Sequence, residues 1–568
     1  MIRELERRFA LIANRRGLAI VVVGLAALLG TMIPYLIYAI SSGVFSSWSF
    51  LTAYDEYSYL LAADTFASGR LTNPTHPMWR HFVTHTVIHQ PTYQSIYAPG
   101  QGMFLAMGRL LTGYPIAGVW ISMALAGSAV CYLLQGWFPP RWALLGGLLA
   151  ALHARMALEW GGTYWGGGVP MLGGALVFGG LRRLLNQPRI GDSFLLALGL
   201  AILANSRPFE GLVASTPAAV MLTGWLVADN GLPLRCRMMR VVAPILGVLG
   251  VSATCISYYN YRLTGSPWTL PYLTYNAQLG QSPFIWQPSD SGSEVESTTS
   301  LDRGVARELS DPHLELIPVE TLWRDEEWWV AAYVGLHANP SLTVASAFKL
   351  AILWFFYVGP VLSVPLLALP WAVRDRWTWF ALSTVGLTLL AVLTTVGAYP
   401  HYLAPVAPLV FVLVVRGTRS LSMWRRRGSR IGRYCVPTIV LLWILQLILA
   451  VGIYPPLTAA ARWGEPRAKL LTQLERMDGD HLVIVRYMPG HVFYQEWVYN
   501  EADIDGAKVV WARELSPDSN RQLLAYFHDR QVWLVEPDRN PPTLVPYDTG
   551  IGMDAPEVTS HGVGLLLP

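Results

Sequence analysis

Stretches of about twenty apolar residues recur along the whole chain, and they limit its fold more than any other feature. Such a stretch is long enough to cross the hydrocarbon core of a bilayer, because a helix rises about 1.5 Å per residue. Only 14% of the residues are charged, whereas soluble domains contain about 25%. The sequence therefore predicts a polytopic α-helical membrane protein.

Hydropathy and the chemistry of the joining segments divide the chain into about eleven transmembrane helices. The predicted spans are residues 18–40, 114–136, 141–158, 166–185, 192–205, 210–228, 239–261, 342–370, 376–396, 400–416 and 434–454. The short spans 192–205 and 210–228 flank the segment NSRPFEG. If these two were a single kinked helix, every later segment would change sides, and the basic joins would then lie on the wrong side of the membrane.

The arginines indicate which way the helices run. The chain begins with MIRELERRFALIANRRG, and later joins on the same predicted side contain RRLLNQPR, RCRMMR and RGTRSLSMWRRRGSRIGR. The opposite joins EWGGTYWGGG and GAYPHY contain no Lys or Arg. The positive-inside rule then predicts a cytoplasmic N-terminus and an outside C-terminal region. Because the arginines cluster at helix ends, nucleic-acid binding is not indicated.

Three large regions lie outside in this topology, and together with the spans they define two domains. The expected transmembrane domain covers residues 1–455 and includes the outside loops 41–113 and 262–341. Residues 456–568 alternate the short β-rich runs HLVIVRY, AKVVWARE and QVWLVEPD with helical patterns. That alternation is typical of a small three-layer α/β (Rossmann-like) domain with a parallel sheet. The tail has no GxGxxG or P-loop motif, so no nucleotide is assigned to it.

Two adjacent carboxylates, Asp55 and Glu56, follow the first predicted span in the segment YDEYSYLLAADTFASG. In one interpretation they cap a helix that begins there, because acidic residues stabilise the free amides of a first helical turn. In the other, one carboxylate at the membrane boundary is a catalytic base, since partial desolvation raises its pKa and makes it a better proton acceptor. The two interpretations are compatible.

This segment, placed in the first outside loop after one span, resembles the GT-C superfamily of polyprenyl-phosphate-sugar glycosyltransferases, in particular protein O-mannosyltransferases and aminoarabinose transferases. YAPGQG and YPHYLAPVAPLVFVL resemble the Pro-Pro motif and the late Arg-Tyr…Pro…Pro signature of that family. The resemblance implies that Asp55 is the catalytic base and Glu56 its partner or the second choice. It also implies a bacterial inner-membrane protein that transfers a sugar to an acceptor hydroxyl on the periplasmic face.

The chain departs from the family at two positions that contact donor phosphate in relatives. Tyr97 stands in the neighbourhood of a basic residue of the family, and His401 replaces the late arginine. Arg207, at a predicted outside turn in ANSRPFEGL, is the best candidate for phosphate binding, because ions at a membrane boundary tend to be functional. Arg80 and His401 are weaker candidates. Alternatively, Arg207 forms a structural pair with Glu210 or is a snorkelling side chain.

Four further residues raise the hypothesis of a divalent metal cation. His81, His85 and His89 are spaced i, i+4, i+8, so on a helix they would share one face and could bind a metal or donate to phosphate. Ordinary interfacial histidines show the same spacing. Glu159, in LEWGGTYWGGG, matches a second acidic site of several family members and could hold a metal with Asp55 or bind the donor sugar. Otherwise it is an acid among aromatic residues of the membrane interface.

The expected reaction needs a base for the acceptor hydroxyl and positive charge for the departing phosphate. Inversion at the sugar is expected, and a retaining double displacement stays open. The expected partners are a polyprenyl-phosphate-linked sugar, a lipid, polysaccharide or protein acceptor, and membrane lipids, without nucleic acid. The alternative function is a lipid or glycolipid transporter or flippase with an external binding domain, which predicts charged residues in mid-span and broken helices. The spans are almost free of ionisable residues, which favours chemistry at the surface.

Overall fold

The structure is a computed structural model that describes residues 2–42, 55–228, 232–278, 342–371, 375–395, 399–424, 431–459, 464–488, 491 and 495–547. Residues 43–54 and 279–341, which belong to the two predicted loops of the membrane domain, lie outside the described residues. The same holds for residues 548–568 of the predicted C-terminal domain.

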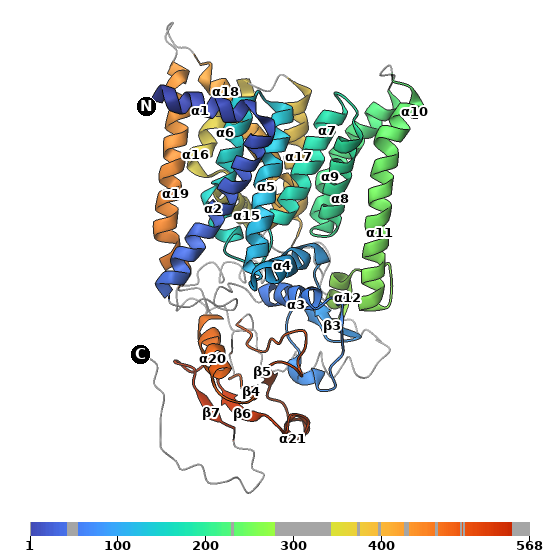
Figure 1. Ribbon diagram of the computed structural model, residues 1–568, viewed down its shortest axis with the longest axis vertical. Helices are drawn as coiled ribbons and strands as arrows, with labels where there is room; N and C mark the ends of the chain where they lie inside the picture. The colour runs from blue at the N-terminus through green and yellow to red at the C-terminus, as the bar shows by residue number, and fades with distance from the viewer. Residues whose placement is uncertain are drawn as a thin grey trace.

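A bundle of long apolar helices forms the larger part of the molecule (Figure 1). Seven described helices are long and apolar enough to cross a membrane, and a pair bent by 91°, Ser346–Tyr357 and Gly359–Trp371, would make an eighth. The protein is therefore a membrane protein with several spans. The helices of the bundle are α1 (Ile2–Asn14), α2 (Arg16–Ser42), α5 (Ile116–Trp137), α6 (Pro140–Ala151), α7 (Gly168–Leu184), α8 (Ile190–Ala204), α9 (Pro208–Val227), α10 (Leu234–Arg237), α11 (Ala243–Thr264), α15 (Leu342–Tyr357), α16 (Gly359–Leu367), α17 (Arg376–Leu393), α18 (Ala407–Ser422) and α19 (Cys435–Ala459).

The predicted number of eleven spans is not confirmed. Helices α6, α7 and α8 contain 12, 17 and 15 residues, fewer than the roughly 20 that usually cross a bilayer. Helix α7 lies inside the bundle against α5 and α8. Its Gly174 lets α7 lie close to the chain around Pro405, because a Cβ on residue 174 would overlap the backbone carbonyl of Pro405.

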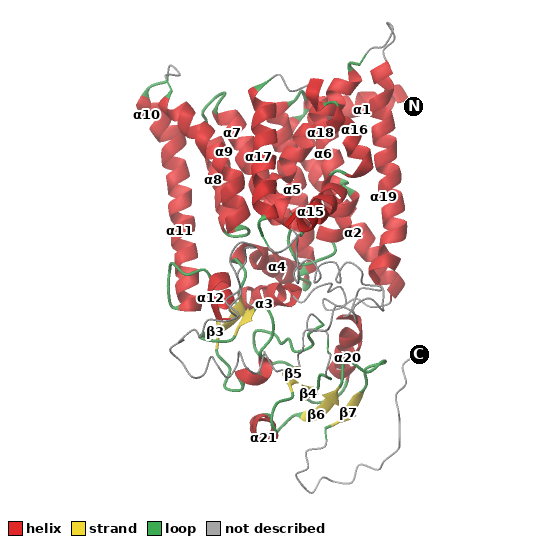
Figure 2. Ribbon diagram, turned by 180° about the vertical axis from the view of Figure 1, so that it is seen from behind, coloured by secondary structure: helices red, strands yellow, loops and turns green. Residues whose placement is uncertain are grey.

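Residues 55–115 form a compact unit at one end of the bundle (Figures 1 and 2). It contains α3 (Asp55–Ala67), the 3-10 turn η1 (Trp79–Phe82), α4 (Pro99–Thr112) and a small antiparallel sheet of β1 (Asn73–Pro74), β3 (Thr92–Ser95) and β2 (Val87–Ile88). Helix α12 (Pro271–Gln278) lies at the same end, whereas α1 and α10 lie at the opposite end (Figure 1).

The histidine segment is not a helix, so the predicted common face of His81, His85 and His89 is wrong. His81 lies in η1, His85 lies in a turn, and His89 follows β2. The β-branched residues that alternate with these histidines in FVTHTVIH favour an extended chain over a helix.

The C-terminal region is an α/β domain, as predicted, with its parallel strands in the three β-rich runs. Strands β4 (His481–Val485), β5 (Val509–Arg513) and β6 (Gln531–Val535) are parallel, in the order β5-β4-β6. The short strand β7 (Leu544–Pro546), which was not predicted, adds to β6 in antiparallel orientation. Two helices complete the described part of the domain, α20 (Gly464–Arg476) and α21 (Pro517–Tyr526).

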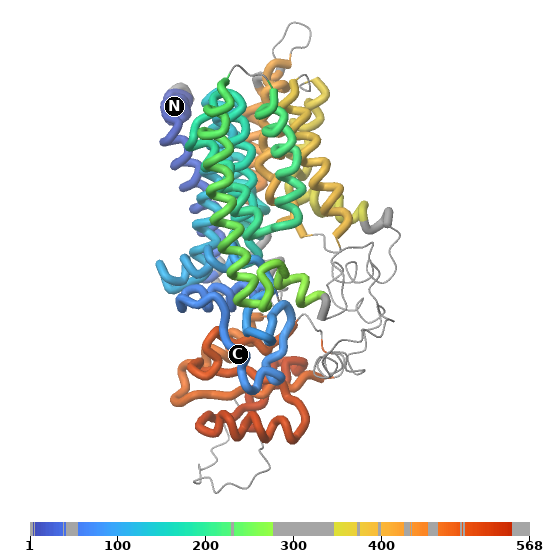
Figure 3. Tube along the Cα trace, turned by 90° about the vertical axis from the view of Figure 1, so that its right-hand side faces the viewer, coloured from blue at the N-terminus to red at the C-terminus, as the bar shows by residue number. Residues whose placement is uncertain are grey.

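The two faces of this sheet are covered by different parts of the chain. Val483 and Trp511 belong to a core with α20. Ile484, on the other face, belongs to a core that contains residues of α21 together with Tyr57 of α3 and Phe82 of η1. A single hydrophobic core therefore joins the first loop to the C-terminal domain, and the two lie side by side in Figures 1 and 3.

Candidate active site at one end of the helix bundle

Asp55 begins α3 and is half-buried at the end of the helix bundle that carries the α/β domain. Burial raises the pKa of Asp55 to about 6, and a hydrogen bond from Tyr97 and the positive charge of Arg207 lower it in part. The structure thus brings together three residues that come from separate segments. A carboxylate with this pKa is ionised at neutral pH and is still basic enough to accept a proton.

Arg207 directly precedes α9 and reaches the same region from the bundle. Its guanidinium carbon lies 5.0 Å from the centroid of the Tyr402 ring. Burial lowers the pKa of Arg207, but the neighbouring Tyr59, Glu210, Tyr402 and Tyr97 raise it above its ordinary value overall. Arg207 is therefore a permanent cation in a partly desolvated place, which is the kind of group that stabilises a phosphate.

Aromatic rings surround the approach to Arg207. The turn η6 (Pro400–Val406) carries His401 and Tyr402, whose rings lie 5.0 Å apart. The ring of Trp165, from the loop before α7, lies 5.1 Å from that of His401. His401 is only 5% exposed, and within the described residues its Nδ1 has no hydrogen-bond partner. A buried imidazole nitrogen beside an arginine can donate to an anion, so His401 stays a candidate phosphate ligand.

Glu159 borders this region in the π-helical turn η2 (Met156–Trp160). Burial raises the pKa of Glu159 to about 7, and the charge of Arg155 lowers it in part. The hydroxyl of Tyr357 lies within electrostatic reach of both Glu159 and Arg207. Glu159 therefore lies on the Arg207 side of the site.

Glu56 is enclosed in the protein, with 0% of its surface exposed. Its Oε2 accepts a hydrogen bond of 2.8 Å from the backbone N–H of Tyr164. The carbonyl of Tyr164 in turn accepts a bond of 2.9 Å from the Gln101 side chain. These bonds fix the loop that carries Trp165. The contacts of Glu56 therefore assign it to the framework of the site, and they favour Asp55 as the residue that meets a substrate.

The residues proposed as metal ligands do not lie together. Within the described ranges, no three His, Cys, Asp or Glu side chains are placed to hold a metal ion. The ring nitrogens of His81 contact the carbonyl oxygens of Arg513 and Ser519 at 2.9 and 3.2 Å. Both ring nitrogens thus face carbonyl oxygens of the C-terminal domain, away from the other residues proposed as metal ligands. The residues proposed for a metal therefore do not fit one.

His85 also lies beside the C-terminal domain, whereas His89 packs within the first loop. Burial lowers the pKa of His85, and the charge of Glu496 raises it in part. His89 is buried beside the Tyr93 ring, 5.3 Å away, and burial lowers its pKa to about 3. His89 is therefore neutral near pH 7.

Arg80 is exposed in η1, with its guanidinium carbon 6.0 Å from the ring of Trp79. His76, just before η1, makes a contact of 3.0 Å with Asp505 through Nε2. The segment around η1 therefore docks the α/β domain, and its contacts do not support Arg80 as a phosphate ligand.

Two tyrosines at the candidate site are not among the residues predicted from the sequence. Tyr59 follows Asp55 by four residues, so helical spacing places both on one side of α3, and its ring stacks on Tyr97 at 4.5 Å. This spacing was a usable signal. Tyr499 of the C-terminal domain stacks on Tyr57 of α3. No local pattern connects positions so far apart in the chain.

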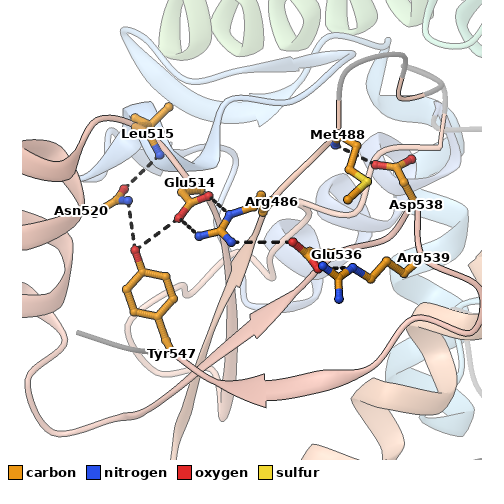
Figure 4. Close-up of polar contacts among 9 residues, drawn as sticks. All are labelled: Arg486, Met488, Glu514, Leu515, Asn520, Glu536, Asp538, Arg539 and Tyr547. Carbon is orange, nitrogen blue, oxygen red and sulfur yellow. Dashed lines mark hydrogen bonds and ion pairs between the residues drawn. The ribbon is translucent and has the colours of Figure 1, made fainter. Parts of the chain in front are cut away.

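A second polar group lies at the carboxyl ends of the parallel strands, where α/β domains often bind ligands. Figure 4 shows Arg486 between Glu514 and Glu536, which follow β4, β5 and β6 respectively. The Arg486 guanidinium donates to Glu514 at 2.7 Å and lies 3.6 Å from Glu536. Because these charges satisfy one another, the group braces the strand ends, and the Asp55 region remains the candidate site.

The fold and the site together define a class: a membrane protein of several helices in which a half-buried carboxylate and a half-buried arginine lie within electrostatic reach of each other beside an α/β domain. No protein-family model matches the chain, and no curated protein matches it.

Among solved structures, the chain is similar to the archaeal oligosaccharyltransferase AglB from Archaeoglobus fulgidus, in complex with an inhibitory peptide and a dolichol-phosphate. That match has 12% identity and a TM-score of 0.46, and it covers 92% of this chain and 69% of AglB. The chain is also similar to ArnT from Cupriavidus metallidurans. The apo form matches with 12% identity, 88% and 92% coverage and a TM-score of 0.44. The form bound to undecaprenyl phosphate matches with 13% identity, 89% and 92% coverage and a TM-score of 0.42.

Proposed function

We propose that this protein is an integral membrane glycosyltransferase, which moves a sugar from a polyprenyl-phosphate donor to an acceptor hydroxyl. The observation that carries the proposal is the pairing of Asp55, whose pKa burial raises to about 6, with the cationic Arg207 at one end of the helix bundle. A lipid-linked donor presents its phosphate at the membrane surface and its sugar in the water beyond it. The resemblance of the segment around Asp55 to the GT-C superfamily supports the same reaction.

In the proposed reaction Asp55 takes the proton of the acceptor hydroxyl while the oxygen attacks C1 of the sugar from the face opposite the phosphate. The bond between C1 and the phosphate oxygen breaks, and its electron pair leaves with the polyprenyl phosphate. Because the acceptor oxygen enters from the opposite face, the configuration at C1 is inverted. Arg207 offers its positive charge to the departing phosphate, where negative charge increases in the transition state. The hydroxyl of Tyr97 holds the carboxylate of Asp55 through its hydrogen bond.

An aromatic surface that suits the sugar lies beside the base. The ring of Tyr97 stacks on Tyr59 at 4.5 Å and lies 6.5 Å from that of Tyr272. Tyr272 is 39% exposed. An exposed ring next to a proton acceptor suits the apolar face of a sugar ring, with the tyrosine hydroxyl left for a polar group. We infer that these tyrosines contact the sugar and that the acceptor is an alcohol of a lipid, a polysaccharide or a protein.

The proposed location is a bacterial inner membrane, with the N-terminus in the cytoplasm and Asp55 on the periplasmic side. Helices α1 and α10 lie at one end of the bundle, and α3, α4 and the C-terminal sheet lie at the other (Figure 1). The end with α1 and α10 contains arginines in both helices. The positive-inside rule assigns such an end to the cytoplasm, which supports this orientation.

The experiment uses the purified full-length protein in lipid nanodiscs with a panel of undecaprenyl-phosphate sugars and one acceptor from each of the three classes. Mass spectrometry measures the release of undecaprenyl phosphate. The proposal expects release from at least one donor, and only when an acceptor is present. In parallel, vesicles containing the protein report whether a labelled lipid-linked sugar changes leaflet. Movement between leaflets without release of undecaprenyl phosphate would contradict the proposal and favour the transporter.

A further inference from the structure

The first turn of α3 is held by a ring from the C-terminal domain. Tyr57 lies two residues after Asp55, and its ring stacks on that of Tyr499 with centroids 3.8 Å apart and planes at 10°. The two side chains are 1% and 4% exposed. Tyr499 also lies close enough to Asp55 for the carboxylate charge to act on its hydroxyl. The stack therefore adjoins the turn that carries the proposed base.

Tyr499 is fixed in turn by Arg467 of α20, which is 1% exposed. Arg467 donates from Nε to the carbonyl of Trp497 and from Nη2 to that of Tyr499, each at 2.8 Å. Its guanidinium carbon lies 5.3 Å from the centroid of the Tyr57 ring and 4.4 Å from that of Trp511. Burying a guanidinium is costly unless it finds such partners. Arg467 thus connects α20, the chain around Tyr499 and α3.

Residues 497–502, called here the 497–502 segment, contact the first loop at further points. The backbone N–H of Ala502 donates to Oδ2 of Asp64 in α3 at 2.7 Å. The hydroxyl of Tyr93 in β3 donates to the carbonyl of Asn500 at 3.0 Å. The Asn500 side chain is joined to the backbone of Trp511 in β5 by two bonds of 2.9 and 2.8 Å. The segment is therefore hydrogen-bonded to the sheet, and it contacts α3 at two positions along the helix.

We propose that the α/β domain is the positioning element of the active site: the 497–502 segment holds α3 so that Asp55 stays directed at Tyr97 and Arg207. The role of Asp55 in this proposal rests on the proposed function. Tyr499 and Arg467 are positioning residues, because they act on Asp55 through α3. A misplacement of about 1 Å can cost about a hundredfold in rate, so such a support has a measurable effect on catalysis.

The test compares Tyr499→Ala with Tyr499→Phe in the full-length protein in nanodiscs. Amide hydrogen exchange of residues 55–67 reports the order of α3 without any substrate. Tyr499→Ala removes the stacked ring, so exchange in this stretch is expected to rise about tenfold or more. Tyr499→Phe keeps the ring and stays near wild type. The matched control is Trp533→Ala, which removes a large ring of the same domain that packs in the core with α20 and hydrogen-bonds His481. Exchange of residues 55–67 in this variant is expected to stay near wild type.

The second measurement separates binding from the chemical step. Binding of undecaprenyl phosphate is expected to stay within about threefold of wild type in all three variants, since Arg207 is untouched. With a donor that wild type turns over, Tyr499→Ala should lower kcat about a hundredfold at similar KM, and Tyr499→Phe should restore it.

Unchanged exchange of residues 55–67 in Tyr499→Ala overturns the support of α3, whatever the substrate. Raised exchange with undiminished kcat overturns its link to Asp55. If wild type turns over no donor but exchange rises as expected, the support of α3 stands and the proposed function fails.

Discussion

Asp55 and Glu56 are neighbours in the chain, but a helix turns by about 100° per residue, so they face different surroundings. Asp55 meets Tyr97 and Arg207, whereas Glu56 is enclosed and bound to the backbone of Tyr164. From the sequence, the pair is expected to be a base with a partner. The contacts separate them into a half-buried residue at the candidate site and a residue of its framework.

The pKa of Asp55 predicts how the rate depends on pH. Burial raises this pKa to about 6, and only the ionised carboxylate accepts a proton. The rate kcat/KM should therefore be constant above pH 7 and fall as the pH drops through about 6, to about one tenth at pH 5. A pH–rate profile in nanodiscs measures this. A rate that stays constant down to pH 4.5 would contradict the role of Asp55 as base.

The positive charge of Arg207 should contribute to the affinity for the lipid phosphate. Arg207→Gln removes the cation and should weaken the binding of undecaprenyl phosphate by about tenfold or more, which corresponds to about 1.4 kcal/mol. Arg189→Gln is the control, because Arg189 is an exposed arginine in the turn between α7 and α8. Titration of both variants with undecaprenyl phosphate measures the difference. Equal affinities would show that the phosphate binds elsewhere.

At the scale of the elements, Glu56 predicts a local loss of stability. Glu56→Ala removes an acceptor of the buried Tyr164 N–H and should lower the free energy of unfolding by about 1–3 kcal/mol. Glu56→Gln keeps an acceptor oxygen and should lose less. Denaturant unfolding followed by tryptophan fluorescence of the loop region compares the two variants. If both variants are as stable as wild type, the bond to Tyr164 does not support the loop.

The elements that could be predicted are those whose period is local. The apolar runs lie in helices, and HLVIVRY, AKVVWARE and QVWLVEPD contain parallel strands, since burial on both faces leaves a continuous apolar pattern. The histidine segment was misread because its i, i+4 spacing also fits an extended chain rich in β-branched residues. Strand β7 is too short to leave a pattern.

The site itself was only partly predictable. Asp55 and Arg207 could be named because polar residues at predicted helix ends stand out in an apolar chain. Their proximity depends on the packing of α3 on α4, whose Gly100 N–H donates to the carbonyl of Asn205 in the turn between α8 and α9, and no single-sequence pattern reports this. The docking of η1 on β5 through His81 and Arg513, and the stack of Tyr57 on Tyr499, join the two ends of the chain. Such contacts follow from the tertiary fold alone.

At the scale of the whole molecule, the two ends of the bundle should face opposite sides of the membrane. In a background without the four native cysteines, Arg521→Cys in α21 and Arg189→Cys between α7 and α8 place single thiols at exposed positions. A membrane-impermeant maleimide applied to intact spheroplasts should label position 521 and should reach position 189 only after lysis. The reverse pattern would place Asp55 in the cytoplasm and contradict the proposed location.

The first loop and the α/β domain share one hydrophobic core, and this links the domain to the candidate site. The domain covers the loop that carries Asp55, and its own sheet needs residues of that loop to bury one face. The two units should therefore gain and lose order together, as expected if the domain supports the candidate active site.

The proposed reaction depends most directly on the carboxylate of Asp55 as the proton acceptor. The single-turnover rate with pre-bound donor tests this role. Asp55→Asn should lower this rate about a thousandfold while the binding of undecaprenyl phosphate changes little, because the amide cannot take the proton. Asp192→Asn is the control, since Asp192 accepts a hydrogen bond from Tyr132 in a different part of the bundle, and it should react like wild type. Equal rates for Asp55→Asn and wild type would contradict the assignment of the base.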